Sequence, residues 1–393
     1  MKILCITPWF PAYREDQQGN FILDSIESLI ELGHELTVLV PQPWRPRVAG
    51  LISKKWKRKK IQIEQYSNKI NLHYCRYFSI PRAYFCSFSF WSFRRNINPI
   101  LENLIAKYQC QIIHAHTELA GISAIDVGKK LGIPTVVTLH GISTEKKLYV
   151  GKTRKLLFEY TLSNADRVIL VGKPLLQFSK NFVNNLEHFR IVGNGFRLYE
   201  NTFNYHEKKG FTNPVNFISV SNLEEGKGIN LNLHALAKLK KNGITNWIYK
   251  IVGDGSEKKN LMKLAAELNL TDQVFFLGAC DHTKVYQHLM QSDIFILPSY
   301  REAFGVAYLE AMSCGLLTVG VRGQGPAAFI EDMRTGLLIE PNNIDALADI
   351  LQYIFLDPNK MFEIATNGKQ YVCSYFTWKV HAKNLEKVYQ EVI

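Results

Sequence analysis

The chain has 393 residues, of which 47% are hydrophobic and 21% charged, a balance typical of a folded globular protein and not of a disordered or collagen-like one. That length suits two domains better than one hydrophobic core. The formal net charge is +12, and residues 1–200 carry 28 lysines and arginines against 15 carboxylates, a net charge of +13. The first half therefore holds all the excess positive charge, and we expect it to meet an anionic partner.

In the first half, the hydrophobic pattern predicts alternating strands and helices. A strand at residues 2–7 is followed by a loop, by a helix whose apolar positions run from Ile22 to Ile30, and by a second strand at 35–40. Further buried strands are predicted at residues 111–114, 135–139, 166–171 and 189–192. Such repeated strand–helix units favour a parallel sheet.

A break in composition at residues 210–214 separates a second series of the same kind. Strands are predicted at residues 217–220, 247–252, 274–277, 294–297 and 317–321, and helices at 228–241, 256–268, 344–355 and 376–392. The pattern predicts an α/β protein with two doubly wound domains, residues 1–205 and residues 213–375. In doubly wound sheets, ligands bind at the carboxyl ends of the strands, so functional residues are expected just after each strand.

Two glutamates follow the strand predicted at 294–297. Glu302 precedes a helix that begins near Gly305, and Glu310 lies on that helix, roughly 7–8 Å along it at about 1.5 Å per residue. The amides and dipole of the first turn favour a phosphate. Glu310 can bind the two hydroxyls of a ribose, and Glu302 a sugar beyond the phosphates. The alternative is a pair of solvated glutamates, but the helix is apolar nearly all round, which disfavours a free surface for Glu310.

This segment resembles a motif of glycosyltransferase family 4, E-x-F-G-x-x-x-x-E-A-M-x-x-G. The matching residues are Glu302, Phe304, Gly305, Glu310, Ala311, Met312 and Gly315. The resemblance implies the GT-B fold: two Rossmann-like domains face each other across a cleft, and the C-terminal helix, residues 376–393, crosses back to the first. The first domain would bind the acceptor and the second the nucleotide sugar.

The resemblance also implies the chemistry. It indicates a retaining, metal-independent transfer of a hexose, without a cofactor, from a UDP-sugar or GDP-sugar to a hydroxyl group. Glu310 would bind the ribose and Glu302 the transferred sugar, and the amides of Phe304, Gly305 and Val306 would meet the sugar and phosphates. A front-face route, in which the leaving phosphate acts as the base, is what the family suggests.

Other positions match the family one by one. Lys227, at the start of a helix, matches a lysine that holds the diphosphate, and Gly19 matches a glycine near the donor phosphates. His140 matches a histidine near the transferred sugar and is predicted, with Glu302 and Lys227, to act in catalysis. Gly253 matches a turn after a strand, and Gly278 a segment whose backbone holds the base. A plain tight turn is an equally good interpretation of Gly253.

One donor-site position departs from the family pattern. The family usually has an arginine about five residues before the lysine, and Asn222 stands there in this chain. Either Lys227 then carries more of the phosphate charge, or Arg301 or Arg322 replaces the missing cation. Reduced activity is the third alternative. The pair His114 and His116 suggests zinc, but no third ligand is evident and no metal site is predicted.

The acceptor is predicted to contact the first half, where two segments stand out. Lys54, Lys55, Trp56, Lys57, Arg58, Lys59 and Lys60 place six cations beside an indole, and residues 77–93 hold eight aromatic residues, Phe90 and Trp91 among them. Basic clusters bind anionic lipid at about 1 kcal/mol per cation, and aromatic rings favour the membrane interface. The prediction is a polyprenyl-linked or glycan acceptor at an anionic membrane surface. A solvated charge run and a core aromatic cluster are the alternative.

No run of about 18 apolar residues is present, the start of the chain lacks a signal-peptide pattern, and the seven cysteines are scattered. These features predict a cytoplasmic protein on the inner face of the cell membrane, in the synthesis of a bacterial cell-surface polysaccharide. Two alternatives stay open: a nucleotide-sugar 2-epimerase of the same fold and a non-enzymatic nucleic-acid-binding protein. The chain shows no RNA-binding or DNA-binding module, so a nucleic-acid partner is not expected.

Overall fold

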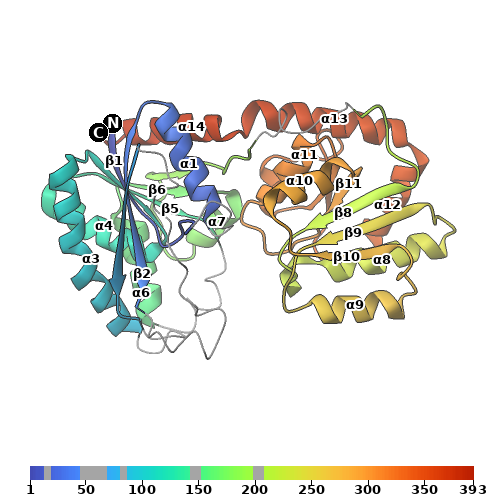
Figure 1. The fold of residues 1–393 in the computed structure, drawn as a ribbon, viewed down its shortest axis with the longest axis horizontal. Helices are drawn as coiled ribbons and strands as arrows, with labels where there is room; N and C mark the ends of the chain where they lie inside the picture. The colour runs from blue at the N-terminus through green and yellow to red at the C-terminus, as the bar shows by residue number, and fades with distance from the viewer. Residues whose placement is uncertain (13–18, 45–68, 80–85, 142–151, 198–207) are drawn as a thin grey trace. The chain divides into compact units, whose positions relative to one another are not determined.

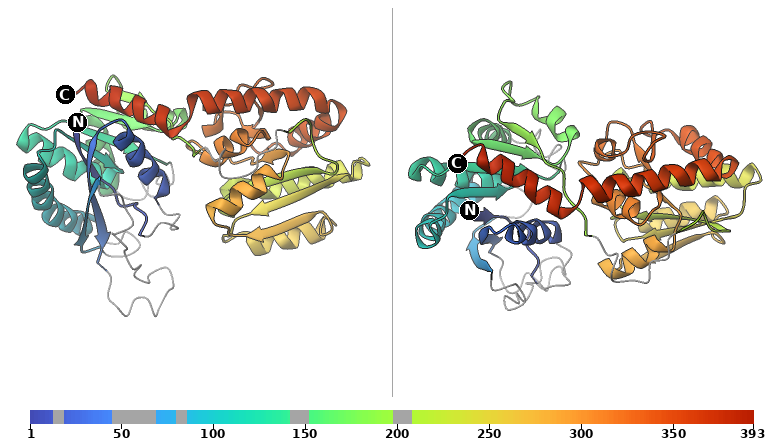
Figure 2. Two further views of the ribbon diagram at one scale, coloured as in Figure 1. Left: turned by 45° about the horizontal axis from the view of Figure 1, so that its top comes forward. Right: turned by 90° about the horizontal axis from the view of Figure 1, so that it is seen from above.

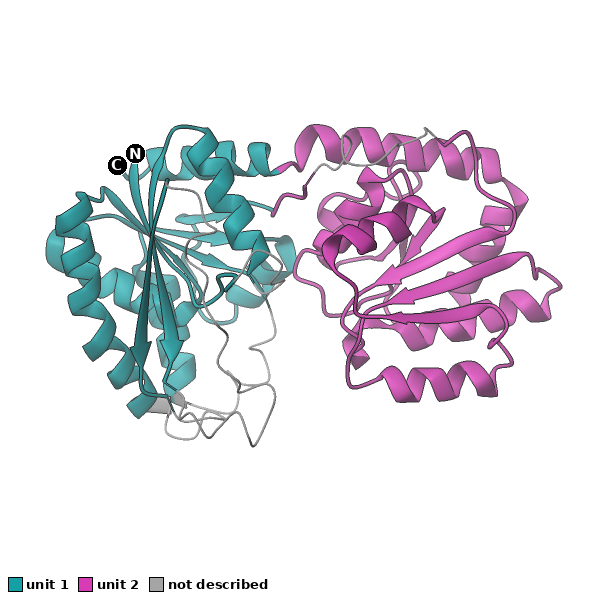
Figure 3. Ribbon diagram, viewed as in Figure 1, with its two compact units in different colours: residues 1–193, 378–393 teal, residues 194–377 magenta. Residues whose placement is uncertain are grey.

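The computed structural model describes residues 1–12, 19–44, 69–79, 86–141, 152–197 and 208–393. It divides into two compact units, residues 1–193 with 378–393 and residues 194–377 (Figure 3). The chain thus enters the second unit before the composition break at 210–214 and returns to the first unit after Thr377.

The first unit is built on a seven-stranded sheet with the order β3-β2-β1-β4-β5-β6-β7 (Figure 1). Every neighbouring pair of strands is parallel. The strands are β1 (Lys2–Ile6), β2 (Glu35–Pro43), β3 (Ile70–Tyr77), β4 (Ile112–His116), β5 (Thr135–Leu139), β6 (Arg167–Leu170) and β7 (Phe189–Ile191). The strand order changes direction between β1 and β4, so the carboxyl ends of these two strands form the switch point of the sheet.

Helices connect these strands and cover the sheet. They are α1 (Asn20–Glu31), α3 (Cys86–Tyr108), α4 (Glu118–Leu131), α6 (Lys152–Asn164), α7 (Lys173–Ser179) and α14 (Trp378–Gln390). The last of these, α14, lies beside α1, so that the two chain termini are neighbours (Figures 1 and 2). This confirms the expected return of the C-terminal helix to the first half of the chain.

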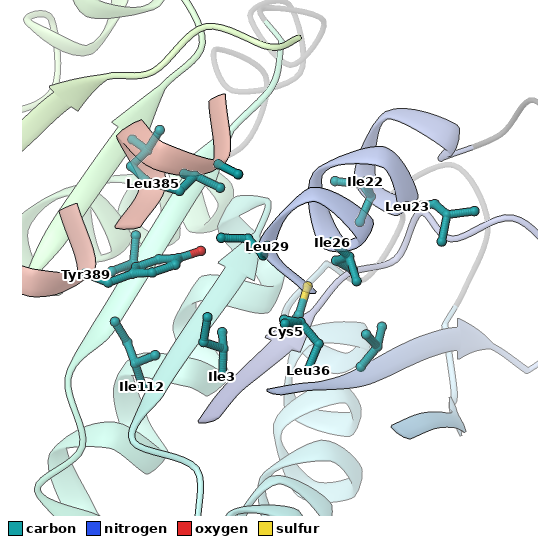
Figure 4. Close-up of a cluster of buried hydrophobic side chains, with 14 of the residues drawn as sticks. Ile3, Cys5, Ile22, Leu23, Ile26, Leu29, Leu36, Ile112, Leu385 and Tyr389 are labelled. Carbon is teal, nitrogen blue, oxygen red and sulfur yellow. The ribbon is translucent and has the colours of Figure 1, made fainter. Parts of the chain in front are cut away.

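Apolar side chains from β1, α1 and α14 form the core of this unit (Figure 4). Ile3, Ile26 and Leu385 are at most 2% exposed, and Tyr389 is completely buried. Each such aliphatic side chain stabilises the fold by about 1.5–3 kcal/mol relative to an exposed one. The hydroxyl of Tyr389 lies 2.7 Å from Nδ1 of His114 on β4, which ties α14 to the sheet with a buried hydrogen bond.

The second unit has a six-stranded parallel sheet with the order β10-β9-β8-β11-β12-β13. The strands are β8 (Val215–Val220), β9 (Trp247–Val252), β10 (Val274–Gly278), β11 (Ile294–Ile296), β12 (Leu317–Val321) and β13 (Leu337–Ile339). The helices are α8 (Ile229–Lys241), α9 (Lys258–Glu267), α10 (His282–Met290), α11 (Val306–Ser313), α12 (Ile344–Leu356) and α13 (Pro358–Tyr375), with 3-10 turns at Glu225–Lys227 and Gly325–Ala328.

The two parallel sheets confirm the predicted doubly wound α/β architecture, and most predicted strands agree with the observed bounds within two or three residues. The sequence patterns predicted neither the strands β3 and β13 nor the helices α3, α6, α7, α10 and α13. Among the helices that the structure describes, none is long and apolar enough to cross a membrane.

Candidate functional site

In the second sheet the strand order changes direction between β8 and β11, and the loops that leave these strands meet at their carboxyl ends. Such a point is where doubly wound sheets bind ligands. The β8 loop leads to Lys227 and the start of α8. The β11 loop leads through Glu302 to the start of α11. Both groups of predicted donor-site residues therefore lie at one edge of one sheet.

Close backbone packing fixes these two loops together. The carbonyl of Gly226 accepts hydrogen bonds from the amide of Tyr300 at 3.1 Å and the hydroxyl of Ser299 at 3.2 Å. A Cβ on Gly228 would stand only 2.4 Å from the carbonyl oxygen of Pro298, so a side chain there would force the loops apart. This packing holds Lys227 next to the β11 loop.

The predicted catalytic residues Lys227 and Glu302 form an ion pair. The Nζ of Lys227 lies 2.8 Å from Oε2 of Glu302, and their side chains are 26% and 15% exposed. The Glu302 backbone is held as well: its amide donates to the side chain of Gln324 at 3.1 Å, and its carbonyl accepts from Gly325 at 2.8 Å. Glu302 is therefore not a solvated loop residue.

The start of α11 has the geometry that an anion site at a helix end requires. Gly305 precedes the helix with φ 93°, in the left-handed region, and no side chain caps the helix. A Cβ on Gly305 would lie 2.6 Å from the ring of Tyr308, so glycine is needed for space as well as for conformation. Phe304 is 3% exposed and packs edge-on against Phe329. The first-turn amides, beginning with Val306, can face a phosphate.

Glu310 is buried within α11, with 8% of the residue exposed. Its Oε1 lies 2.8 Å from Nε2 of His282, the first residue of α10. The interpretation of Glu310 as a surface residue is therefore wrong. The sequence pattern did not identify His282, although this residue lies shortly after the carboxyl end of β10, the kind of position at which doubly wound sheets bind ligands.

The structure explains why the predicted donor-site positions 253 and 278 are glycines. Gly253 has φ 136°, its amide donates to the carbonyl of Gly278 at 2.8 Å, and a Cβ there would overlap the carbonyl oxygen of Ser221. Gly278 has φ 75° at the end of β10. Backbone packing explains Gly253 and the positive φ explains Gly278, and the predicted donor contacts of both stay predictions.

Asn222 is exposed in the β8 loop, where the family has an arginine. Of the two predicted substitutes, Arg322 forms ion pairs with Asp332 at 2.6 Å and Glu340 at 2.9 Å. The side chain of Arg301 instead runs past Gly226, with its Cδ 3.4 Å from where a Cβ of that glycine would lie. The aliphatic part of the Arg301 side chain thus packs against Gly226, the residue before Lys227, and its guanidinium carbon lies 5.7 Å from the centroid of the Tyr300 ring.

In the first unit, Gly19 and His140 lie at the ends of elements around the β1–β4 switch point. Gly19 precedes α1 with φ 90°, and a Cβ there would lie 2.6 Å from the backbone of Trp9. The His140 ring contacts Phe21 at a centroid distance of 5.0 Å and shares a 2.8 Å hydrogen bond with His116. Burial lowers the pKa of His140 to about 3, so the ring is neutral at physiological pH.

The two histidines of β4, His114 and His116, are buried and hydrogen-bonded to neighbouring side chains. Both ring nitrogens of His114 make 2.7 Å contacts, to Tyr389 and Thr138, and burial lowers its pKa to about 3. A histidine with both nitrogens engaged has no lone pair left for a metal ion. Within the described part of the chain, no three His, Cys, Asp or Glu side chains gather as a metal site.

The predicted acceptor segments are partly described. Residues 54–60 lie outside the described residues. In the aromatic segment, Tyr77 and Phe93 are buried against each other, with ring centroids 4.8 Å apart, as the core-cluster alternative expected. Trp91 is 54% exposed and Phe90 is half-buried, so the segment has both a core side and a surface side.

Two family models match the sequence, Glycosyltransferase Family 4 over residues 18–199 and Glycosyl transferases group 1 over residues 201–371. Together they span both units. The chain belongs to the family 4 glycosyltransferases of the GT-B fold, and it is a glycosyltransferase. The matches name transferases, so the epimerase and nucleic-acid-binding alternatives are not favoured.

Curated relatives and a solved structure are similar to this chain over most of its length. An uncharacterized glycosyltransferase of Methanocaldococcus jannaschii, MJ1178, is 24% identical, with 91% of this chain and 99% of that protein covered. The phosphatidylinositol N-acetylglucosaminyltransferase gpi3 subunit of Schizosaccharomyces pombe is 24% identical, over 95% of this chain and 77% of that protein. The crystal structure of Anabaena HepE in complex with UDP and glucose covers all of both chains with a TM-score of 0.72 and 19% identity.

Proposed function

We propose that this glycosyltransferase takes a hexose from a UDP-sugar or GDP-sugar and binds that donor at the carboxyl edge of the second sheet. The observation that carries the proposal is the grouping there of the Lys227–Glu302 pair, the uncapped start of α11 and the buried Glu310. Lys227 and the helix amides would hold the diphosphate, Glu310 the ribose and Glu302 the sugar. The similarity to HepE, solved with UDP and glucose, supports a nucleotide-sugar donor.

A thermal-shift screen of nucleoside diphosphates tests the donor site. UDP or GDP should raise the melting temperature of the wild-type protein, because a ligand that binds only the folded state stabilises it. Glu310→Ala should lose most of that shift, since the ribose then lacks its carboxylate. Absence of a shift for every nucleotide tested would contradict the donor assignment.

The proposed reaction retains the anomeric configuration of the sugar. As the sugar departs, negative charge develops on the phosphate oxygens, and Lys227 together with the α11 amides would stabilise that charge. The leaving phosphate would then take the proton of the acceptor hydroxyl, and the acceptor oxygen would bond to the anomeric carbon on the face from which the diphosphate left. Proton NMR of the first product formed would show the anomer of the donor; the opposite anomer would exclude this route.

For the acceptor we propose a lipid-linked or glycan hydroxyl in cell-surface polysaccharide synthesis, reached at an anionic membrane. Four exposed aromatic residues, Trp44, Phe78, Phe88 and Trp91, form a continuous surface, with successive ring centroids 5.8–5.9 Å apart. Each is 43–54% exposed, and Arg95 lies over the Trp91 ring. Aromatic rings flanked by cations are typical of membrane interfaces.

Vesicle sedimentation tests the membrane proposal. More protein should pellet with anionic than with neutral vesicles. Trp91→Ser should reduce the fraction of protein that pellets with anionic vesicles by about half or more. Leu356→Ser is the matched control, because Leu356 is an exposed apolar residue of the other unit, 71% exposed. Equal recovery with the two kinds of vesicle would contradict the proposal.

A further inference from the structure

His282 is held in place by its own helix. The Asp281 side chain accepts a hydrogen bond from the amide of Lys284 at 2.8 Å, which fixes the start of α10. One turn further on, the ring of Tyr286 lies edge-on to the imidazole with centroids 5.2 Å apart. Tyr286 is only 2% exposed, and its hydroxyl donates to the carbonyl of Arg197 at 2.8 Å. The imidazole therefore rests against an immobile side chain.

The contact between His282 and Glu310 fixes a proton as well as a position. An ionised carboxylate only accepts hydrogen bonds, so the 2.8 Å contact to Oε1 requires a proton on Nε2 of His282. The carboxylate side chain of Glu310 is 10% exposed, and the imidazole is 38% exposed. A carboxylate so deeply buried is stable only when its oxygens have donors.

We propose that His282 is a positioning residue of the donor site: by donating Nε2–H to Oε1 it sets the Glu310 carboxylate so that Oε2 can accept from the ribose hydroxyls. The proposal rests on the donor site proposed above and adds a residue to it. His282 itself makes no contact with the reacting atoms. His282 should therefore affect donor affinity only through Glu310, and only when the nucleotide carries the ribose hydroxyls that Glu310 binds.

Titration calorimetry tests this with UDP, GDP and their 2′,3′-dideoxy analogues. We expect His282→Ala to weaken binding of the ribonucleotide about tenfold, the order of effect of one hydrogen bond to a charged group. Binding of the dideoxy analogue should change by less than about twofold. His282→Gln, whose amide nitrogen can occupy the place of Nε2, should restore most of the affinity. His288→Ala, at a second histidine of α10, should bind as the wild type does.

A double substitution separates positioning from a general loss of structure. Adding His282→Ala to Glu310→Ala should cause no further loss of affinity, because the histidine acts only through the carboxylate. Unchanged UDP and GDP binding by His282→Ala would overturn the proposal. So would equal losses for the ribonucleotide and the dideoxy analogue, which indicate a structural role. Wild-type protein that binds neither UDP nor GDP overturns the proposed donor site and this inference with it.

Discussion

At the residue scale, the ion pair of Lys227 and Glu302 is the central feature of the site. The side chains are 26% and 15% exposed, so the pair is largely buried, and removing one partner leaves the other charge without its counter-ion. An anion that approaches Lys227 can replace Glu302 as its counter-ion, so the pair can open without leaving the ammonium group unpaired. A diphosphate with two or more negative charges can compete with one carboxylate for the ammonium group, and Glu302 is then free to meet sugar hydroxyls. Substitutions at this pair should therefore affect the reaction and, because they leave a buried charge unpaired, the stability of the fold as well.

We expect Lys227→Ala to lower kcat by about 100-fold or more, because a cation that stabilises the leaving phosphate is lost. Its melting temperature should fall as well, because Glu302 is left without its counter-ion, and circular dichroism checks that the variant is still folded at the assay temperature. Lys238→Ala is the control, since Lys238 is an exposed lysine of α8 that pairs with Asp345. Initial rates of sugar release from the donor provide the measurement. Activity of Lys227→Ala within tenfold of the wild type would show that the lysine does not support the leaving group.

At the element scale, the site depends on loops that glycines allow to approach closely. Apolar, β-branched runs predicted the central strands well, since buried parallel strands have a distinct sequence pattern. The edge strand β3 was missed because most of its residues are only partly buried, and α3 because aromatic residues and an internal proline, Pro99, obscure its helical period. Their position after a predicted strand, together with the resemblance to the family motif, located Glu302 and Glu310. The partnership of His282 with Glu310 arises from tertiary packing, which spacing does not encode.

Two glycines with positive φ allow the role of close packing to be measured. Gly253→Ala should lower the free energy of unfolding by at least about 2 kcal/mol, because its Cβ would overlap the Ser221 carbonyl in addition to the backbone strain. Gly243→Ala should cost only about 1 kcal/mol, since Gly243 has φ 86° but no atom within 4 Å of its Cβ position. Denaturant unfolding compares them. Equal losses would mean that the β8 loop can move aside.

At the scale of the whole molecule, the C-terminal helix α14 completes the first unit through buried imidazoles. His381 of α14 hydrogen-bonds to Ser25 of α1 at 2.9 Å and to the carbonyl of Gly193 at 2.7 Å, while Tyr389 holds His114. Burial lowers the pKa of His114 to about 3 and that of His381 to about 4. Both rings must therefore stay neutral in the folded unit.

This arrangement predicts how stability depends on pH. In the unfolded chain these histidines have their ordinary pKa of about 6.5 and take up protons below that pH, whereas in the folded unit they stay neutral. The contribution of these histidines to stability is therefore complete above pH 6.5 and is lost as the pH falls towards 4. Each histidine contributes up to about 1.4 kcal/mol per pH unit in that interval. Calorimetric unfolding should show a falling transition temperature from pH 6.5 to 4.5. A transition temperature that does not change over this interval would mean that these rings are protonated in the fold.

The central claim is that one loop and helix after β11, together with Lys227, hold the whole nucleotide sugar. A crystal structure of the protein with UDP-glucose or a GDP-hexose, whichever binds, tests it most directly. We predict the ribose hydroxyls within hydrogen-bonding distance of Glu310, the diphosphate on Lys227 and the first turn of α11, and the hexose at Glu302. A nucleotide bound elsewhere, with the Lys227–Glu302 pair intact and Glu310 free of ribose, would contradict the account.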